Sequence, residues 1–394
     1  MSEFFILSAI KAAGVAFVLL TTLAYLQWVE RKVIAHIQGR LGPHRVGPHG
    51  LLQPLADVIK LITKEDLMPP QANRFVFLLA PFLAVSMALL AFAVIPFGGQ
   101  IELFGRTTWL QLADLNIGVL FILAAGSMGV YGIALAGWAS NNKYSLLGGL
   151  RSSAQMISYE LPLVLAVVSP LLLANTLSLR EITLAQAGFY FGFLPRWHIF
   201  QAPLPQILSF LIFLIAAFAE TNRVPFDLPE AENELVAGFH TEYSSMKFAS
   251  FFMAEYANMI TACSLTTVLF LGGWQAPVPA PLAGYLPSAL FFLAGAVALS
   301  HGLRPARRFD RITLPVAALF FFGVAAALLV PGARPFHSLF WFAAKTGLLL
   351  FVFIWVRGTL PRFRYDQLMH FAWKALFPVA IVNLLATGLA AALT

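Results

Sequence analysis

Seven of the 18 acidic residues of this chain lie between positions 220 and 255, although only 11% of all residues are charged. A carboxylate beside hydrocarbon costs roughly 2.5 to 3.5 kcal/mol on insertion scales, so such groups are usually paired, protonated or enclosed in a polar cavity. The sequence therefore favours a role in handling protons for these seven residues, which are Glu220, Asp227, Glu230, Glu232, Glu234, Glu242 and Glu255.

Three ionisable residues stand inside strongly apolar segments: Glu160, Glu255 and Lys345. Each can be a paired charge or a neutral group held by a hydrogen bond, in which case its role is structural. We favour the functional interpretation, because ionisable residues within membrane segments are rare and commonly belong to ion or proton pathways. Burial favours the neutral form of a carboxyl group, which allows it to take up and release protons. Lys345 is a possible charge partner for one of these acids.

The spacing of Asp227 and Glu230, with Pro229 between them, also matches the start of a helix. An acidic side chain can cap the first turn, where proline is tolerated and the helix dipole favours negative charge. This structural role stays open for these two residues. It does not account for Glu234, which stands four positions after Glu230 on one helical face, where two ionised carboxylates repel each other.

The chain as a whole has the composition of a membrane protein. It has 394 residues, of which 59% are hydrophobic and 14% aromatic. Apolar runs of about twenty residues recur along it, each long enough to cross a bilayer as a helix. The sequence predicts an all-α, polytopic protein with one integral membrane domain over 1–394. Its predicted spans are 4–28, 75–96, 115–138, 155–175, 203–220, 248–272, 285–302, 313–331, 338–356 and 371–392.

The distribution of lysine and arginine predicts how these ten spans are oriented. Nineteen of the 25 basic residues fall in alternate loops, at 30–74, 139–154, 220–250, 301–312 and 357–374. Basic residues concentrate in cytoplasmic loops, so both termini are predicted on the outer side. This topology explains the net charge of +7, and we expect no nucleic-acid partner.

The first inner loop has structure of its own. From Leu51 to Ile62 apolar residues recur at helical spacing, with polar residues on the other side, which predicts an amphipathic helix in the membrane interface. The preceding segment, 39–50, is rich in glycine and proline and favours tight turns that present Arg40 and Arg45. This segment does not match the pattern of a phosphate-binding loop, because no strand precedes it and no Gly-Lys-Ser/Thr sequence ends it.

Cysteine and histidine usage limits the redox chemistry of the chain. Its one cysteine, Cys263, lies in an apolar run, and an iron–sulfur cluster requires several thiolates. The eight histidines show no pairing on a helical face that is typical of metal sites. We expect neither a metal nor a redox cofactor to be bound by this chain alone.

Four segments of the chain closely resemble one known family. They are 30–66 (beginning ERKVIAHIQGRLGPHRVGPHG), 143–163 (KYSLLGGLRSSAQMISYELPL), 219–259 (beginning AETNRVPFDLPEAENELVAGF) and 357–374 (RGTLPRFRYDQLMHFAWK). The family is the quinone-site membrane subunits of respiratory complex I, proton-translocating NADH:quinone oxidoreductase, which comprises mitochondrial NADH dehydrogenase subunit one and its bacterial counterparts. The resemblance covers most of 1–275 and 335–394.

The resemblance implies a function that the residues alone do not specify. Members of the family form the cavity through which ubiquinone or menaquinone reaches an iron–sulfur cluster held by a partner protein. By resemblance, the acidic path that links this cavity to proton channels in neighbouring subunits corresponds to Glu160, Glu220, Asp227, Glu230, Glu232, Glu234, Glu242 and Glu255. The residues that correspond to the quinone cavity or its inner-face interface are Arg31, Arg40, Arg45, Phe226, Arg357, Arg362, Arg364 and Asp366.

The same resemblance implies partners and a location. Quinone is the substrate, FMN and iron–sulfur clusters belong to partner subunits, and the isolated chain is expected to have no catalytic activity. The expected partners are the quinone-module subunits of the peripheral arm and the neighbouring subunits of the membrane arm. The expected location is a bacterial-type plasma membrane, or the mitochondrial inner membrane if the protein is organellar.

One segment departs from the family. Most members run from the counterpart of Gly272–Trp274 almost directly into the lysine-containing span, whereas this chain has an additional segment at 275–335 with two apolar runs. Two extra spans preserve the orientation of all that follows. We predict a lipid-facing helical hairpin that leaves the core of eight spans unchanged.

Two other functions stay open. A homologous ion-coupling subunit of a membrane-bound hydrogenase-type complex would keep the acidic path but use a different electron acceptor. A stand-alone secondary transporter would also place charges within the membrane, but that class commonly has internal repeats. The acidic segment occurs once in this chain, which disfavours a transporter.

Overall fold

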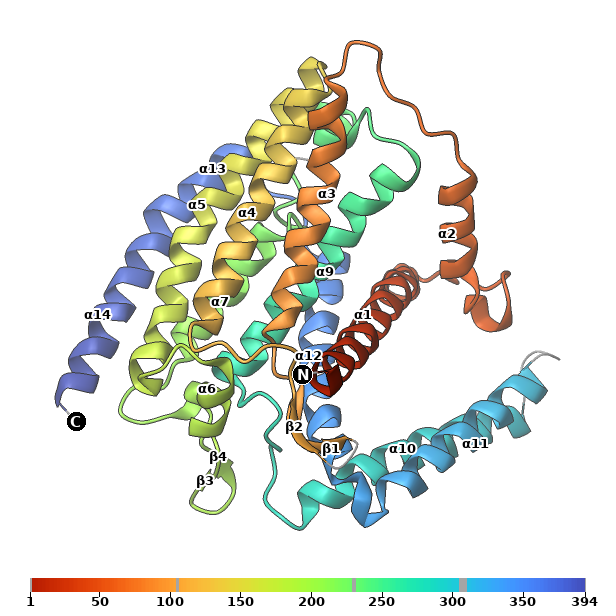
Figure 1. The fold of residues 1–394 in the computed structure, drawn as a ribbon, viewed down its shortest axis with the longest axis vertical. Helices are drawn as coiled ribbons and strands as arrows, with labels where there is room; N and C mark the ends of the chain where they lie inside the picture. The colour runs from red at the N-terminus through yellow and green to blue at the C-terminus, as the bar shows by residue number, and fades with distance from the viewer. Residues whose placement is uncertain (1, 104–105, 229–231, 305–309, 394) are drawn as a thin grey trace.

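Long helices dominate the computed structural model, which describes residues 2–103, 106–228, 232–304 and 310–393. The predicted all-α class is confirmed, and Figure 1 shows most of the helices running together in one inclined bundle. The long helices are α1 (Ser2–Ile37), α3 (Arg74–Leu90), α4 (Gly118–Ala139), α5 (Lys143–Ala174), α7 (Ile207–Glu220), α9 (Ser245–Phe270), α10 (Leu282–Leu303), α11 (Asp310–Leu328), α12 (Arg334–Thr359) and α14 (Phe377–Leu393).

Eight helices in the described part of the chain are long and apolar enough to cross a membrane. They coincide with eight of the ten predicted spans, and the chain is an integral membrane protein. The other two predicted spans correspond to α7, which is apolar but has only 14 residues, and to α9, which has 26 residues but is not among the eight. The total of ten spans therefore stays a prediction.

Short elements connect these helices. Two antiparallel ribbons, which the apolar pattern did not predict, pair β1 (Gly98–Leu103) with β2 (Arg106–Leu110) and β3 (Phe189–Tyr190) with β4 (Leu194–Pro195). Strands this short carry too little alternation to stand out in a sequence. The other short elements are the helices α2 (Gln53–Thr63), α6 (Leu179–Ala185), α8 (Glu232–Leu235) and α13 (Tyr365–Phe371), the 3₁₀ turns η1 (Pro48–Gly50), η2 (Ala91–Ala93), η3 (His198–Phe200), η4 (Gly238–His240) and η5 (Pro331–Ala333), and a π-helical turn, η6 (Ala372–Leu376).

The loops gather at the two ends of the bundle as the basic residues predict. The predicted inner loops contact one another through Arg151 and Glu234, Leu67 and Ser244, and Arg362 and Asp227. The predicted outer loops contact one another through Arg180 and Asp114, and Gly99 and Ser338. The division of the loops into two sets therefore agrees with the prediction, whereas the set that faces the cytoplasm stays a prediction.

Small residues allow the central helices to approach closely. A Cβ atom added to Gly132 on α4 would lie 3.0 Å from the carbonyl oxygen of Ala80 on α3. A Cβ atom added to Gly148 on α5 would lie 2.6 Å from the Cα of Gly238 in η4. Contacts of this kind are typical of membrane helices, which associate by van der Waals packing because lipid provides no hydrophobic driving force.

The amphipathic segment forms α2, which stands apart from the bundle in Figure 1. The side chains of Leu55, Ile59 and Ile62 on its apolar face are exposed. On the other face, Asp57 accepts hydrogen bonds from Arg31 of α1 at 2.8 Å and from Gln53 at 2.9 Å. This arrangement agrees with an apolar face of α2 that is turned toward lipid. That α2 lies in the membrane interface stays a prediction.

The additional segment contains α10 and α11, which pack against each other as a hairpin beside the bundle (Figure 1). At the end nearest the first inner loop, Asp310 of α11 lies 3.1 Å from His49 of η1. The outward faces of both helices carry exposed Phe, Leu and Val side chains, which agrees with contact to lipid. Arg304 directly follows α10, and Arg307 and Arg308 lie outside the described residues.

Candidate functional site

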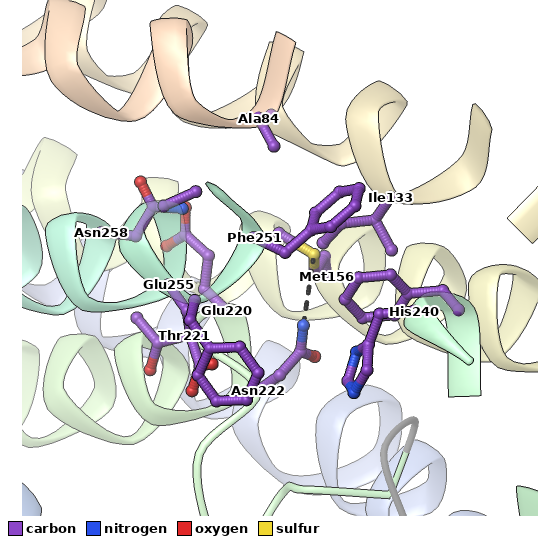
Figure 2. Close-up of a pocket in the computed structure, with 14 residues that line it drawn as sticks. Ala84, Ile133, Met156, Glu220, Thr221, Asn222, His240, Phe251, Glu255 and Asn258 are labelled. Carbon is purple, nitrogen blue, oxygen red and sulfur yellow. Dashed lines mark hydrogen bonds between the residues drawn. The ribbon is translucent and has the colours of Figure 1, made fainter. Parts of the chain in front are cut away.

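The inner ends of α7 and α9 bring two buried carboxylates to one small cavity. Glu220 is the last residue of α7, and Glu255 lies three turns into α9. The cavity has a volume of about 40 Å³ and is also lined by Asn222, Asn258 and His240. Figure 2 shows the two glutamates on one side and His240 on the other. A cavity needs roughly 10 to 15 Å³ to hold a water molecule, so this one has room for a few waters and none for a quinone.

Arg223 connects this cavity to a second group of charges. Its guanidinium lies 2.7 Å from the Glu255 carboxylate and 2.9 Å from that of Glu30 on α1. It also stacks over the ring of Tyr256, 4.3 Å from the centroid. Glu30 forms a further ion pair with Arg357 near the end of α12. Four charged side chains from α1, the loop after α7, α9 and α12 thus form one buried network.

A second ion pair lies next to that network. Asp227 is buried and lies 2.9 Å from Arg362, which follows α12. Phe226, also buried, packs between Tyr159 of α5 and Phe363, with ring centroids 5.3 and 5.5 Å away. The structure therefore brings together three residues predicted for the quinone region, Phe226, Arg357 and Arg362, and two predicted for the acidic path, Asp227 and Glu255.

The spacing of Asp227 and Glu230 also predicted the start of a helix. Leu228 is not helical, and residues 229–231, where the first turn of that helix would lie, are outside the described residues. The capping hypothesis therefore stays a prediction, and what the structure shows is that the Asp227 carboxylate pairs with Arg362. Glu230 lies outside the described residues, and so does the side chain of Glu232.

The remaining acids of the predicted path differ in their surroundings. Glu160 on α5 accepts a hydrogen bond from Ser127 of α4 and lies within electrostatic reach of Glu220. Glu242 accepts a hydrogen bond from Asn142 at 2.6 Å. Glu234 is exposed and pairs with Arg151 at 2.7 Å. Glu160 thus belongs to the buried group, whereas Glu234 lies at its surface.

The other residues predicted for the quinone region lie on the surface of the same end. Arg31 is exposed and pairs with Asp57 of α2. Arg364 lies 3.6 Å from Asp366 at the start of α13, and both of these side chains are exposed. Arg40 and Arg45 are exposed in the turns between α1 and α2. The structure does not bring these five residues into one cluster.

Lys345 has a different partner from the one we expected. Its ammonium donates to the backbone carbonyl oxygens of Leu271 at 2.6 Å, Gly273 at 2.9 Å and Gln275 at 2.6 Å. It also lies 4.3 Å from the ring centroid of Trp197. These acceptors follow α9, at the end of the bundle away from the acids, and they replace the carboxylate that we predicted as the partner of Lys345.

Sequence reasoning missed three residues that complete the site: Glu30, Arg223 and His240. Glu30 and Arg223 stand beside residues that the motifs identified, but nothing in the sequence shows that they meet. Burial lowers the pKa of His240 to about 4, because the imidazolium form would lose its hydration. His240 is therefore neutral at physiological pH, with the rings of Phe239, Phe248 and Phe252 around it.

Among the described residues, no group of three or more His, Cys, Asp or Glu side chains is arranged to hold a metal ion. Cys263 is buried in α9. The acidic site consists of carboxylates, arginines and amides, a set that can bind and pass protons.

Comparison with known proteins identifies the family. A family model described as NADH dehydrogenase matches residues 10–388. The chain belongs to this family. A protein of Solibacter usitatus, named as a subunit of NADH-quinone oxidoreductase, is 65% identical over 396 residues, which cover 100% of this chain and 99% of the relative. A protein of Koribacter versatilis named for the same subunit is 51% identical, with 99% and 98% covered, and one of Geobacter metallireducens is 46% identical, with 98% and 96% covered. The resemblance inferred from the four motifs is confirmed.

Proposed function

We propose that this chain is a non-redox membrane subunit of proton-translocating NADH:quinone oxidoreductase. The names of its relatives and its apolar helices support this proposal. Quinone is the substrate, and the FMN and iron–sulfur clusters belong to partner subunits of the peripheral arm. Neighbouring membrane-arm subunits receive the protons, and the isolated chain catalyses no reaction. The membrane is a bacterial-type plasma membrane with both termini on the outer side.

The buried network around Arg223 is the observation that carries the proposal. One arginine contacts both Glu255, which lines the small cavity, and Glu30, which contacts Arg357. Two unit charges 4 Å apart interact by about 4 kcal/mol at an effective dielectric constant of about 20. Each contact in this series is at least that close, so a change of charge near Arg357 can alter the protonation of Glu255 through Glu30 and Arg223.

The quinone region is the inner end of α12 and the loop after α7. Phe226 offers an apolar ring, and Arg357 and Arg362 offer hydrogen-bond donors to a polar head group. When a quinone is reduced there and takes up protons, the local charge changes, and the arginines and Asp227 pass that change to Glu255 and Glu220. These two acids then exchange protons with Glu160, with Glu242 and with waters in the cavity, and Glu230, Glu232 and Glu234 extend the path.

A substitution at Glu255 tests the relay in the assembled complex. Glu255→Gln keeps the shape and hydrogen-bonding capacity of the side chain but cannot release a proton. We expect quinone-linked proton pumping to fall while electron transfer from NADH to an artificial acceptor is retained. Glu181→Gln is the matched control, because Glu181 lies at the opposite end of the bundle and accepts a hydrogen bond from Thr176. Unchanged pumping in Glu255→Gln would remove Glu255 from the path.

Two alternatives make different predictions for the purified protein. A hydrogenase-type complex would copurify with iron–sulfur subunits but would not reduce quinone. A secondary transporter would move its solute as a single chain, with no flavin or iron–sulfur partner. Copurification of those partners together with inhibitor-sensitive quinone reduction excludes both alternatives.

A further inference from the structure

The β3–β4 ribbon places two aromatic side chains at its tip. The backbone N–H of Phe193 donates to the carbonyl oxygen of Tyr190 at 3.3 Å and closes the turn. Phe191 has φ 54° and Gly192 has φ 80°, so two successive turn residues are in the left-handed region. Turns with two positive φ angles match the twist of a two-stranded ribbon, which explains the glycine.

Phe191 is an unusual residue for that turn. A positive φ is strained for a bulky residue and normally selects glycine, asparagine or aspartate. Phe191 is 90% exposed and Phe193 is 69% exposed, so most of both residues is left uncovered by this chain. The turn therefore keeps an aromatic residue at a strained backbone position, and it gains little packing within this chain in return. Two neighbouring exposed aromatic rings at one tip suit contact with a surface outside this chain.

The place of the ribbon indicates what that surface is. It lies in the loop between α5 and α7, and Figure 1 shows it beyond α6 at the lower end of the bundle, the end at which α14 finishes. The flanking residues Leu184 and Ile207 are exposed apolar side chains at the same end. The aromatic tip therefore lies at the same end of the bundle as these exposed apolar side chains, where the spanning helices finish.

The charge of the segment agrees with a lipid surface. Arg196 is the only charged residue between Glu181 and Glu220. Its guanidinium stacks on the ring of Tyr190, 5.0 Å from the centroid, at the base of the ribbon. A cation beside aromatic rings matches the membrane interface, where aromatic residues lie at the head-group level and arginine meets phosphate.

We propose that the β3–β4 ribbon is a membrane anchor whose tip lies in the phospholipid head-group region of the outer leaflet. Phe191 and Phe193 reach the boundary of the acyl chains, and Arg196 contacts lipid phosphate. The anchor fixes the loop between α5 and α7 against the bilayer. It is independent of the quinone and proton chemistry proposed for the opposite end.

Fluorescence in the reconstituted complex tests the anchor. An environment-sensitive fluorescent amino acid replaces Phe191 in one preparation and Ala187, an exposed residue before the ribbon, in the other. The complex is placed in vesicles of phosphatidylethanolamine and phosphatidylglycerol. We expect the probe at 191 to emit at shorter wavelength, to be quenched several-fold more strongly by spin-labelled lipid than the probe at 187, and to be protected from iodide.

The same measurement distinguishes lipid from the other surroundings. Iodide quenching at 191 equal to that at 187 would mean that the tip projects into water, and the anchor would be refuted. Protection from both iodide and spin-labelled lipid would mean that a partner protein covers the tip, which also refutes it. Arg196→Gln is expected to reduce the lipid quenching at 191 in vesicles that contain phosphatidylglycerol, and an unchanged value would remove Arg196 from the contact.

Discussion

Removing Arg223 tests whether the charged side chains of the buried network depend on one another for stability. These are Glu30, Arg223, Glu255 and Arg357. In Arg223→Met the guanidinium is lost, and Glu30 and Glu255 no longer share the cation that lies 2.9 and 2.7 Å from them. The Glu30 side chain is only 3% exposed and that of Glu255 only 15%, so bulk solvent does not compensate for the lost arginine as it would at the surface. Glu30 keeps Arg357, so the larger effect falls on Glu255.

The expected loss of stability follows from the burial of these groups. Removing one partner of a buried ion pair costs about 3 to 5 kcal/mol, because the other charge stays buried. Since every 1.4 kcal/mol is a tenfold change in an equilibrium constant, the population of opened molecules should rise by roughly 10²-fold to several times 10³-fold. The exposed pair of Arg151 and Glu234 provides the control, because Arg151→Met should cost at most about 1 kcal/mol.

The single cysteine of the chain reports this population. Cys263 is buried in α9, two turns after Glu255, and reacts with an alkylating reagent only when that helix opens. The rate of alkylation is measured in the intact complex, by mass spectrometry of the peptide that contains Cys263, so that cysteines of other subunits do not contribute. Arg223→Met should raise this rate and Arg151→Met should leave it close to that of the unaltered chain.

A double variant decides whether the network explains the loss. Arg223→Met with Glu255→Gln removes both the cation and the carboxylate that depends on it, so much of the lost stability should return. A coupling energy of about 1.5 kcal/mol or more is expected for charges this close. If the two single effects instead add to within about 0.5 kcal/mol, the residues act independently and the network is refuted.

Four further predictions concern other parts of the chain. Arg362→Ala should raise the KM for quinone with little change in NADH oxidation by an artificial acceptor, and an unchanged quinone response would remove Arg362 from the quinone region. Gly148→Ala should lower the melting temperature of the chain, because the new Cβ meets Gly238 at 2.6 Å and overpacking typically costs about 1 to 3 kcal/mol. Lys345→Met should destabilise the outer end by about 1 to 3 kcal/mol or more, since buried carbonyl oxygens lose their donor, and hydrogen exchange after α9 would detect it. Because the pKa of His240 is lowered to about 4, only the unfolded chain gains a proton there as the pH falls from about 6.5, and stability is lost between pH 6.5 and 4, by about 3 kcal/mol in total. Thermal unfolding of His240→Asn should lack this part of the pH dependence.

The sequence predicted the elements of the site better than their contacts. The apolar runs placed eight spanning helices, and the acidic segment and the four motifs identified the family and most residues of the inner end. These features are local, because hydropathy acts over about twenty consecutive residues and motifs are contiguous. The partner expected for Lys345 was wrong, because this contact is not a local feature of the sequence. Its acceptors are backbone carbonyl oxygens, which any residue type could supply.

By itself, the sequence determined that carboxylates gather near the inner ends of membrane helices and which loops share a side. Only the tertiary structure decided which charges meet, because Glu30, Arg223, Glu255 and Arg357 are far apart in the chain and become neighbours through the packing of α1, α9 and α12 around the loop after α7. Ion pairing depends on distances of a few ångströms, and helix crossing and rotation set those distances. These distances cannot be predicted from the composition of one chain or from the spacing of its residues.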